Sequence, residues 1–313
     1  MFPPAAGADG AGDRGSGGGW PGALARILAF AGLMLLFGYA LGLGWSALPV
    51  PESGAWVFAG VAVTAAAALA AGALLIRYAD GRSPGALGIG LSRATPMHSG
   101  AGLAIGVAAL LAAVLGLLVT GSLEYAVQPG SVGGWLAVVA GQGAVFALAA
   151  LAEEAVFRGY PFQVLVRSAG PAVATAVTSA LFAVAHSTNP EVGPFALLNI
   201  FLAGVLLAVA YLRTLSLWFA TAVHLGWNWA MATLFDLPVS GIQLFDTPGY
   251  DAIVSGPQWW SGGEFGPEGG LVGTIGFGVA LLVVLRLRWV RPDPAIAAAA
   301  PLVLDRERVS HDG

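Results

Sequence analysis

The sequence predicts an all-α membrane protein: a bundle of about eight transmembrane helices with both termini in the cytoplasm. The first reason is composition, because 57% of the residues are hydrophobic and only 10% are charged. Soluble domains carry roughly a quarter charged residues, so that class is excluded. The second reason is a series of apolar stretches near the ~20 residues that a bilayer crossing needs. The third is the placement of arginine.

The apolar stretches define the predicted helices in order. They lie at about 24–43, 55–76, 102–119, 135–157, 171–186, 195–212, 217–234 and 271–287. The first is too long for a signal-peptide core, so we expect it to be retained. Residues 1–19, rich in Gly, Ala and Pro, are predicted to be a disordered tail, residues 20–290 the transmembrane domain, and residues 291–313 a polar C-terminal tail.

Between these stretches arginine occurs only in alternate connections, and the remaining arginines lie near the two ends of the chain. Arg82, Arg167 and Arg213 mark three of those connections, whereas the opposite ones contain acidic residues such as Glu124 and Glu191 and no arginine. Arginine-bearing short loops stay in the cytoplasm, so this pattern predicts a multi-pass protein, which we expect in the plasma membrane. The scattered arginines exclude a nucleic-acid surface, and the absence of cysteine excludes disulfides and a thiol nucleophile.

Two connections stand out by composition. Residues 235–269 form the longest one and contain Trp259 and Trp260, which predicts an interfacial lid of aromatic side chains. Residues 80–96 are rich in glycine but lack the Lys-Ser/Thr ending of a phosphate-binding loop, so a turn is expected there.

Three polar clusters interrupt the apolar stretches. Ionisable groups at membrane depth cost at least ~2.5 kcal/mol each on insertion scales, so such clusters indicate function. Each cluster contains a pair at i and i+4, which places both residues on one helix face. The clusters are Glu153 and Glu154 with Arg158, Phe182 with His186, and His224 with Asn228.

A depth estimate tests whether the clusters can meet. If Arg213 marks the membrane boundary, His224 lies eleven residues further along, or ~16 Å, near the middle of the membrane. Glu153 reaches a comparable depth only if Arg167, not Arg158, marks the boundary of its own helix. Arg158 is then buried and neutralised by a glutamate.

The residue types suit hydrolysis of an amide bond. A buried carboxylate beside an imidazole can take a proton from water and deliver hydroxide to a carbonyl. A second imidazole with a carboxamide one turn away supplies donors for the developing oxyanion. The same donors suit zinc, ligated by Glu153, His186 and His224, although no His-Glu-x-x-His run is present. Glu154 and Arg158 also fit a purely structural ion pair.

These motifs resemble those of the CAAX protease and bacteriocin-processing family (CPBP, or Abi), which includes the Rce1-type prenyl-protein endopeptidases. The resemblance rests on Glu153-Glu154-x-x-x-Arg158, Phe182-x-x-x-His186 and His224-x-x-x-Asn228, and it covers roughly 135–231. It implies an intramembrane endopeptidase acting on a peptide or lipidated protein substrate in the bilayer, without nucleic acid.

The resemblance also implies a role for each residue. Glu153 would activate water with the help of His186, and His224 with Asn228 would form the oxyanion site. Glu154 and Arg158 would support the first carboxylate. The family is often labelled metal-dependent, and a metal-free glutamate mechanism is the reading we favour over zinc. A proton-coupled transporter and a non-catalytic scaffold are the alternative functions.

Overall fold

The computed structural model describes residues 19–46, 55–243, 246–292 and 294–305, and it confirms an all-α bundle. The tail predicted at 1–19 lies almost entirely outside these residues, as do position 293 and the last part of the predicted C-terminal tail. All eight predicted apolar stretches form helices. They are α1 (Trp20–Ser46), α2 (Ala55–Tyr78), α3 (Thr95–Val119), α4 (Val132–Phe157), α6 (Pro171–Ala185), α7 (Pro194–Thr214), α8 (Leu217–Thr233) and α10 (Leu271–Arg286).

Five candidate spans are long and apolar enough to cross a membrane by length and composition. They are Trp20–Trp45, Val57–Tyr78, Thr95–Val119, Val132–Ala169 and Pro194–Thr214. The other helices are shorter: α6 has 15 residues, which extend ~22 Å against a ~30 Å hydrocarbon core. The chain is therefore a multi-pass membrane protein, whereas eight crossings and the side of each terminus stay predictions.

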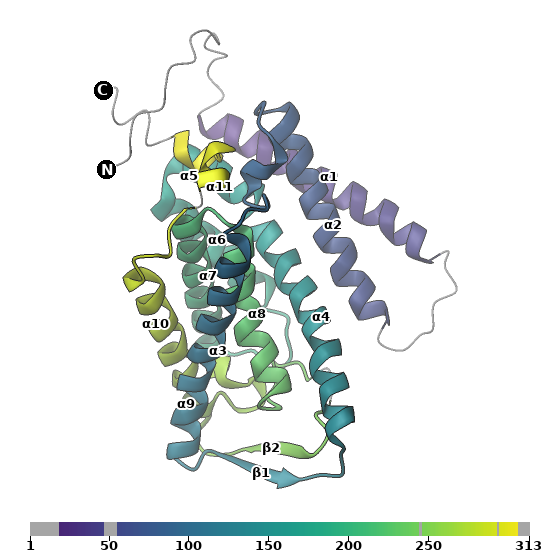
Figure 1. The fold of residues 1–313 in the computed structure, drawn as a ribbon, viewed down its shortest axis with the longest axis vertical. Coiled ribbons are helices and arrows are strands. Elements are labelled where there is room, and N and C mark those ends of the chain that lie inside the picture. The colour runs from purple at the N-terminus through teal and green to yellow at the C-terminus, as the bar shows by residue number, and fades with distance from the viewer. Residues whose placement is uncertain (1–18, 47–54, 244–245, 293, 306–313) are drawn as a thin grey trace.

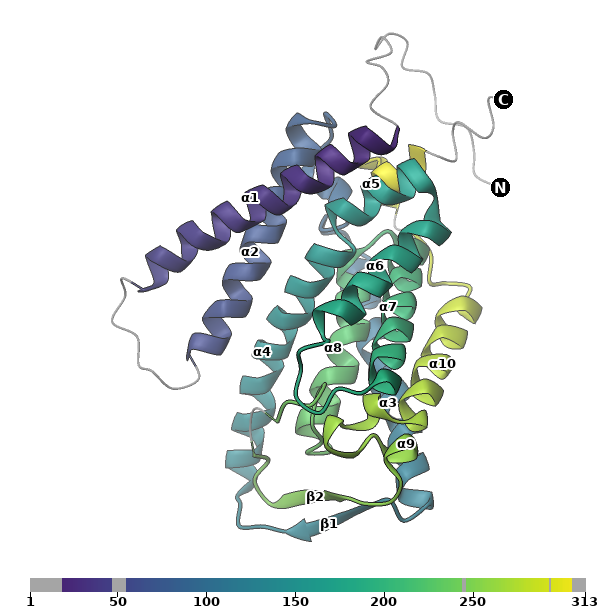
Figure 2. The ribbon, with the colours of Figure 1, turned by 180° about the vertical axis from the view of Figure 1, so that it is seen from behind.

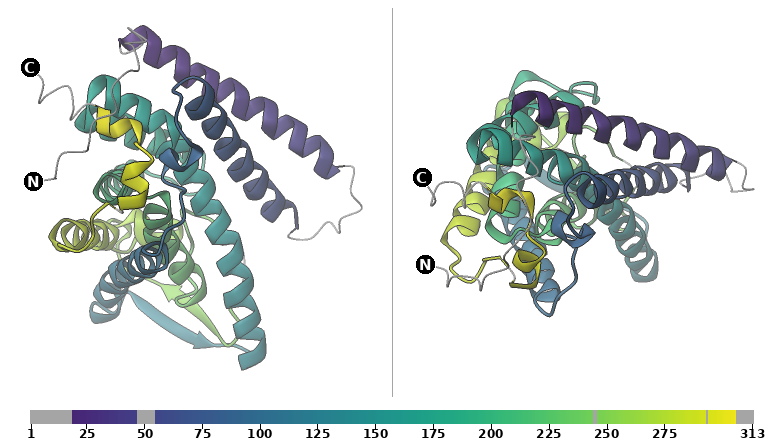
Figure 3. Two further views of the ribbon diagram at one scale, coloured as in Figure 1. Left: turned by 45° about the horizontal axis from the view of Figure 1, so that its top comes forward. Right: turned by 90° about the horizontal axis from the view of Figure 1, so that it is seen from above.

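The helices α3, α4, α6, α7, α8 and α10 form the main bundle (Figure 1). The α1–α2 hairpin lies beside α4 and leans away from the bundle, as Figures 2 and 3 show. At one end of the bundle, β1 (Leu123–Val127) pairs antiparallel with β2 (Tyr250–Val254). We call this the sheet end.

Arginine side chains mark the opposite end, which we call the arginine-bearing end. Asp80 accepts a hydrogen bond from Arg167 at 2.9 Å and lies 3.5 Å from Arg26. Arg82 binds both carboxylate oxygens of Asp305, at 2.7 and 2.9 Å. Two connections and the C-terminal tail, which the sequence assigned to one side of the membrane, are thus in contact.

The short helix α5 (Tyr160–Ala169) lies across this end, and the last described residues pack on it (Figure 1). They form α11 (Pro294–Ala298) and the 3₁₀ turn Leu302–Leu304. The backbone N–H of Leu302 donates to the Gln163 side chain at 2.9 Å, and Leu302 is fully buried. Burial of apolar side chains such as Leu302 therefore holds part of the predicted polar C-terminal tail against the bundle.

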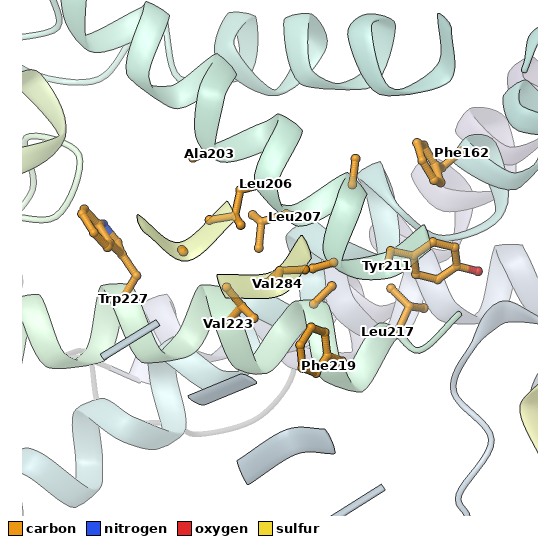
Figure 4. Packing of buried hydrophobic residues seen from close by; sticks show 14 of the residues in the cluster. Phe162, Ala203, Leu206, Leu207, Tyr211, Leu217, Phe219, Val223, Trp227 and Val284 are labelled. Atoms are coloured by element: carbon orange, nitrogen blue, oxygen red, sulfur yellow. The ribbon is translucent and has the colours of Figure 1, made fainter. Parts of the chain in front are cut away.

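The core surrounds α8. Figure 4 shows Val223 and Trp227 of α8 on the side toward Leu206 and Leu207 of α7, whereas the Phe219 ring points away from these leucines and its centre lies 6.2 Å from that of His98 in α3. On its other side α8 touches α3 where Gly226 meets Gly106, and a Cβ at Gly106 would lie 2.2 Å from the Val223 carbonyl oxygen. Small residues permit such close approach between membrane helices. The helix that carries His224 and Asn228 is thereby held on both sides.

The long connection 235–269 folds over the sheet end. It contains β2, the short helix α9 (Gln258–Ser261) and two 3₁₀ turns, Gly263–Phe265 and Pro267–Gly269. Asp236 anchors it by accepting hydrogen bonds from the backbone N–H groups of Thr247 and Ala252, both at 3.2 Å. Burial raises the pKa of the Asp236 carboxyl above its ordinary value. The connection predicted to turn at 80–96 contains the 3₁₀ turn Pro84–Leu87.

Candidate functional site

The first cluster lies at the C-terminal end of α4. Arg158 follows the last helical residue, and its backbone N–H closes the final turn onto Glu154. The next residue is Gly159, where a Cβ would lie 2.1 Å from the Ala155 carbonyl oxygen. Only glycine fits this approach, so the chain can turn sharply from α4 into α5. The turn keeps Arg158 inside the protein.

Glu154 and Arg158 form a fully buried ion pair. The two side chains are 0% exposed, and Arg158 Nη1 lies 3.0 Å from Glu154 Oε1. Arg158 Nη2 donates to the Gly204 carbonyl of α7 at 2.9 Å, and its guanidinium lies 4.7 Å from the Phe182 ring centre. Arg158 is thus buried, and Glu154 neutralises its charge. This is the arrangement expected if Arg167, not Arg158, marks the membrane boundary of the helix that carries Glu153.

His224 joins this pair from α8. Its Nδ1 lies 3.0 Å from Glu154 Oε1, so that one carboxylate oxygen contacts both Arg158 and His224. A carboxylate without a proton can only accept, so Nδ1 of His224 carries the hydrogen. Its Nε2 faces Glu153, with 3.8 Å between Nε2 and Oε2.

His186 approaches the same carboxylate from the end of α6. Its Nδ1 lies 2.8 Å from the Phe182 carbonyl oxygen, which fixes the hydrogen on Nδ1 because a carbonyl cannot donate. Nε2 of His186 is 4.0 Å from Glu153 Oε2. Three helices therefore bring two imidazole Nε2 atoms to one carboxylate oxygen.

The two adjacent glutamates have different surroundings. The Glu153 side chain is 34% exposed, whereas that of Glu154 is 0% exposed. Glu153 Oε2 is itself buried and has no hydrogen-bond partner among the described residues. Consecutive helical residues point ~100° apart. The Glu154 carboxylate is therefore directed into the ion pair, whereas Glu153 has a carboxylate oxygen to which no described side chain donates a hydrogen bond.

A partly open cavity borders the histidines. It leaves about 30 Å³ for the centres of water-sized molecules, and both His186 and His224 line it. Asn228, predicted to share a face with His224, lies in the same wall. The remaining wall is mostly apolar and includes Phe182. The second and third predicted clusters thus line the cavity, whereas Glu153, Glu154 and Arg158 are not among its lining residues and contact it through the two imidazoles.

Glu268 is a residue of this cavity to which the sequence analysis assigned no role in the site. It is 4% exposed, and its carboxylate accepts hydrogen bonds from Trp227 Nε1 at 3.0 Å and from Ser240 Oγ at 2.6 Å. The Ser240 backbone N–H also donates to it, at 2.8 Å. Trp227 packs against Phe277, with ring centres 4.4 Å apart, and also donates this bond to Glu268. The sequence signal at this position was Gly269 and Gly270, which follow Glu268 directly before an apolar stretch.

The spacing of the predicted zinc ligands can be compared with that of a tetrahedral zinc site. Among the described residues, no group of three or more His, Asp or Glu side chains could hold a metal ion. The separations of 3.8 and 4.0 Å between Glu153 Oε2 and the imidazoles are wide for ligands that each lie ~2.0–2.2 Å from tetrahedral zinc. The predicted zinc ligands are brought together, but not at ligand spacing.

Comparison with known proteins identifies the region that contains the site. Residues 133–230 match the protein family described as type II CAAX prenyl endopeptidase Rce1-like. The match includes every predicted site residue and nearly coincides with the predicted 135–231, so the resemblance is confirmed for this region. No curated protein and no solved structure matched the chain.

Proposed function

Because residues 133–230 carry an Rce1-like domain of a protease family, we propose that this chain is an intramembrane endopeptidase in which Glu153 activates the attacking water. The observation that supports this role is the convergence of His186 and His224 on Glu153 Oε2. Both separations are too long for direct hydrogen bonds but suit one bridging water.

The proposed reaction begins with proton transfer from water to the Glu153 carboxylate. In its neutral form His186 presents an Nε2 lone pair to the same water, because Nδ1 is bonded to the Phe182 carbonyl. The oxygen of water forms a bond to the carbonyl carbon of the substrate, and the C=O electron pair moves to oxygen. Glu153 then returns its proton to the leaving nitrogen as the C–N bond breaks.

The oxyanion would be stabilised by Asn228 and His224. Asn228 offers an amide N–H, and its side chain makes no hydrogen bond within the described structure that would compete. His224 uses Nδ1 for Glu154, so it would donate to the oxyanion through Nε2 as an imidazolium. Donors that are held in place in a water-poor site stabilise developing charge without reorganisation.

The Glu154–Arg158 pair would position the reacting groups. Glu154 orients His224 through the 3.0 Å contact with Nδ1, and the Arg158 guanidinium packs on the Phe182 ring. Phe182 in turn supplies the carbonyl that orients His186. Neither Glu154 nor Arg158 needs to touch the substrate in this scheme.

The test is cleavage of membrane-tethered fluorogenic peptides by purified protein in liposomes. Glu153→Gln keeps the side-chain size and removes the base, so we expect the rate to fall by about 10²–10⁴-fold. Glu264→Gln is the matched control, since Glu264 is an exposed glutamate in the connection at the sheet end. Cleavage by Glu153→Gln at the rate of the unaltered protein would overturn the proposal, and thermal unfolding shows whether the variants remain folded.

A further inference from the structure

A second hollow opens on the outer surface of the bundle, between α3 and α10. It has about 500 Å³ of free space and belongs to neither the histidine cavity nor the sheet end. Its walls are apolar apart from one indole N–H. They consist of Ala101, Ala104, Ile105, Ala108 and Ala109 of α3, Val279, Ala280 and Val283 of α10, and Leu287 and Trp289 beyond it. We call it the α3–α10 groove.

The groove has a closed end and an open end. At Gly276 the two helices touch, because a Cβ there would lie 2.8 Å from the Ala109 carbonyl oxygen. Beyond this contact the side chains on α3 are mostly alanines, which leave space between the helices as far as Leu287 and Trp289. The groove therefore runs from mid-bundle toward the arginine-bearing end.

Positive charge gathers where the groove ends. Arg286, Arg288 and Arg291 are exposed, and no ion pair involves any of them in the part of the chain that the structure describes. Arg288 stands directly between Leu287 and Trp289, which both line the groove. Three guanidinium groups thus occur within six residues beside an apolar slot.

The residues at the open end of the groove are held in place by hydrogen bonds to their backbone. Arg213 Nη2 donates to the carbonyl oxygens of Leu287 and Val290, at 3.0 and 3.1 Å. Val290 is fully buried, whereas Trp289 is 46% exposed. Tryptophan with neighbouring arginine is the composition found at the level of lipid headgroups.

We propose that the α3–α10 groove binds one acyl chain of an anionic phospholipid, whose phosphate is held by Arg286, Arg288 and Arg291. A peptide strand would bring backbone N–H and C=O groups into a groove that offers them no partners, which is costly in a membrane. A hydrocarbon chain needs none. Guanidinium groups near the membrane surface attract anionic headgroups and hydrogen-bond phosphate readily.

The groove and the histidine cavity share a wall. Ala109 and Ala280 line both hollows, so the bound chain would press on the same small residues that border the space beside Trp227. Lipid binding can nevertheless be measured without any catalytic assay. The proposal therefore stands or falls independently of the proposed protease activity.

The experiment titrates the purified full chain in detergent with phosphatidylglycerol and, separately, with phosphatidylcholine of identical acyl chains, and counts bound lipids by native mass spectrometry. Phosphatidylglycerol should bind more tightly. Arg288→Gln should weaken its binding about fivefold, which corresponds to ~1 kcal/mol, and should leave phosphatidylcholine unaffected. Ala104→Phe should weaken both lipids, because it fills the groove from an exposed position.

Matched controls lie on α2. Arg77→Gln removes an exposed arginine near the same end of the bundle, and Ala66→Phe adds the same bulk to an exposed face. Neither should change lipid binding. The proposal is overturned if both lipids bind equally to the unaltered protein, if the controls lose as much binding as the groove variants, or if soluble glycerol phosphate displaces the lipid at equal concentration. It is also overturned if Ala104→Phe abolishes a dimer of this chain instead of lipid binding.

Discussion

Removing the Arg158 side chain should destabilise the protein through the carboxylate it leaves behind. In Arg158→Met the carboxylate of Glu154 stays buried at 0% exposure, with only His224 for a partner. Breaking a buried ion pair by deleting one partner typically costs about 3–5 kcal/mol, since the remaining charge cannot reach water. The bond to the Gly204 carbonyl, of the charge-assisted kind worth about 1.5–3 kcal/mol, is lost in the same substitution.

The double variant Glu154→Gln with Arg158→Met separates these contributions. It loses the bond to Gly204 as well, but it leaves no uncompensated charge, and a Gln oxygen can still accept from His224 Nδ1. We therefore expect the double variant to be more stable than Arg158→Met alone. Arg77→Met, an exposed arginine, is the control and should change the free energy of unfolding by less than ~0.5 kcal/mol.

The assay is reversible unfolding in mixed detergent micelles, followed by circular dichroism and by tryptophan fluorescence. A loss of 3–5 kcal/mol lowers the folding equilibrium constant by roughly 10²- to 10⁴-fold, well above the error of such titrations. Two results would refute the reasoning. One is an Arg158→Met variant that loses less than ~1 kcal/mol, and the other is a double variant as unstable as the single one.

Three further outcomes follow from the site and the sheet end. Asn228→Ala should lower kcat by about 10²–10³-fold with little change in KM, as for other oxyanion donors; a change in KM alone would contradict the role. Because burial raises the pKa of Asp236, the folded state binds that proton more tightly than the unfolded state, so the stabilisation is present below the ordinary carboxyl pKa and is lost as pH rises through the folded value. The pH slope of the unfolding temperature should therefore differ between the unaltered protein and Asp236→Asn, and identical slopes would contradict this. Exhaustive dialysis against a chelator should leave peptide cleavage unchanged, since Glu153, His186 and His224 are not at ligand spacing; restoration of a lost activity by added zinc would contradict it.

Much of the bundle is predictable from hydrophobic length alone. All eight apolar stretches become helices, and the boundaries of α2, α6 and α8 differ from prediction by at most two residues. Apolar length marks a helix reliably but does not fix whether it crosses the membrane, since α6 is too short by itself. The burial of Arg158 was predicted because only a buried arginine brings Glu153 level with His224.

The contacts made by the connections were not predictable in the same way. The pairing of β1 with β2 joins segments more than a hundred residues apart, and neither strand has a strong alternating pattern. Glu268 was given no role in the site because its partners are neutral donors, Trp227 and Ser240, so no opposite charge in the sequence pointed to it. The β1–β2 pairing and the hydrogen bonds of Glu268 both depend on contacts between segments that lie far apart in the sequence.

The arrangement of Glu268 and the two strands has a consequence for the order in which the protein is made. Ribosomes release a chain from its N-terminus, and Glu153, His186, His224 and Asn228 are all synthesised by residue 228. The segments that close the region around them come later: β2 ends at Val254, and the carboxylate that receives the Trp227 N–H is at residue 268. A nascent chain thus contains all the side chains proposed to react before it contains the residues that enclose them. The region around these side chains is closed only after β2 has been synthesised and can pair with β1 in the α3–α4 connection.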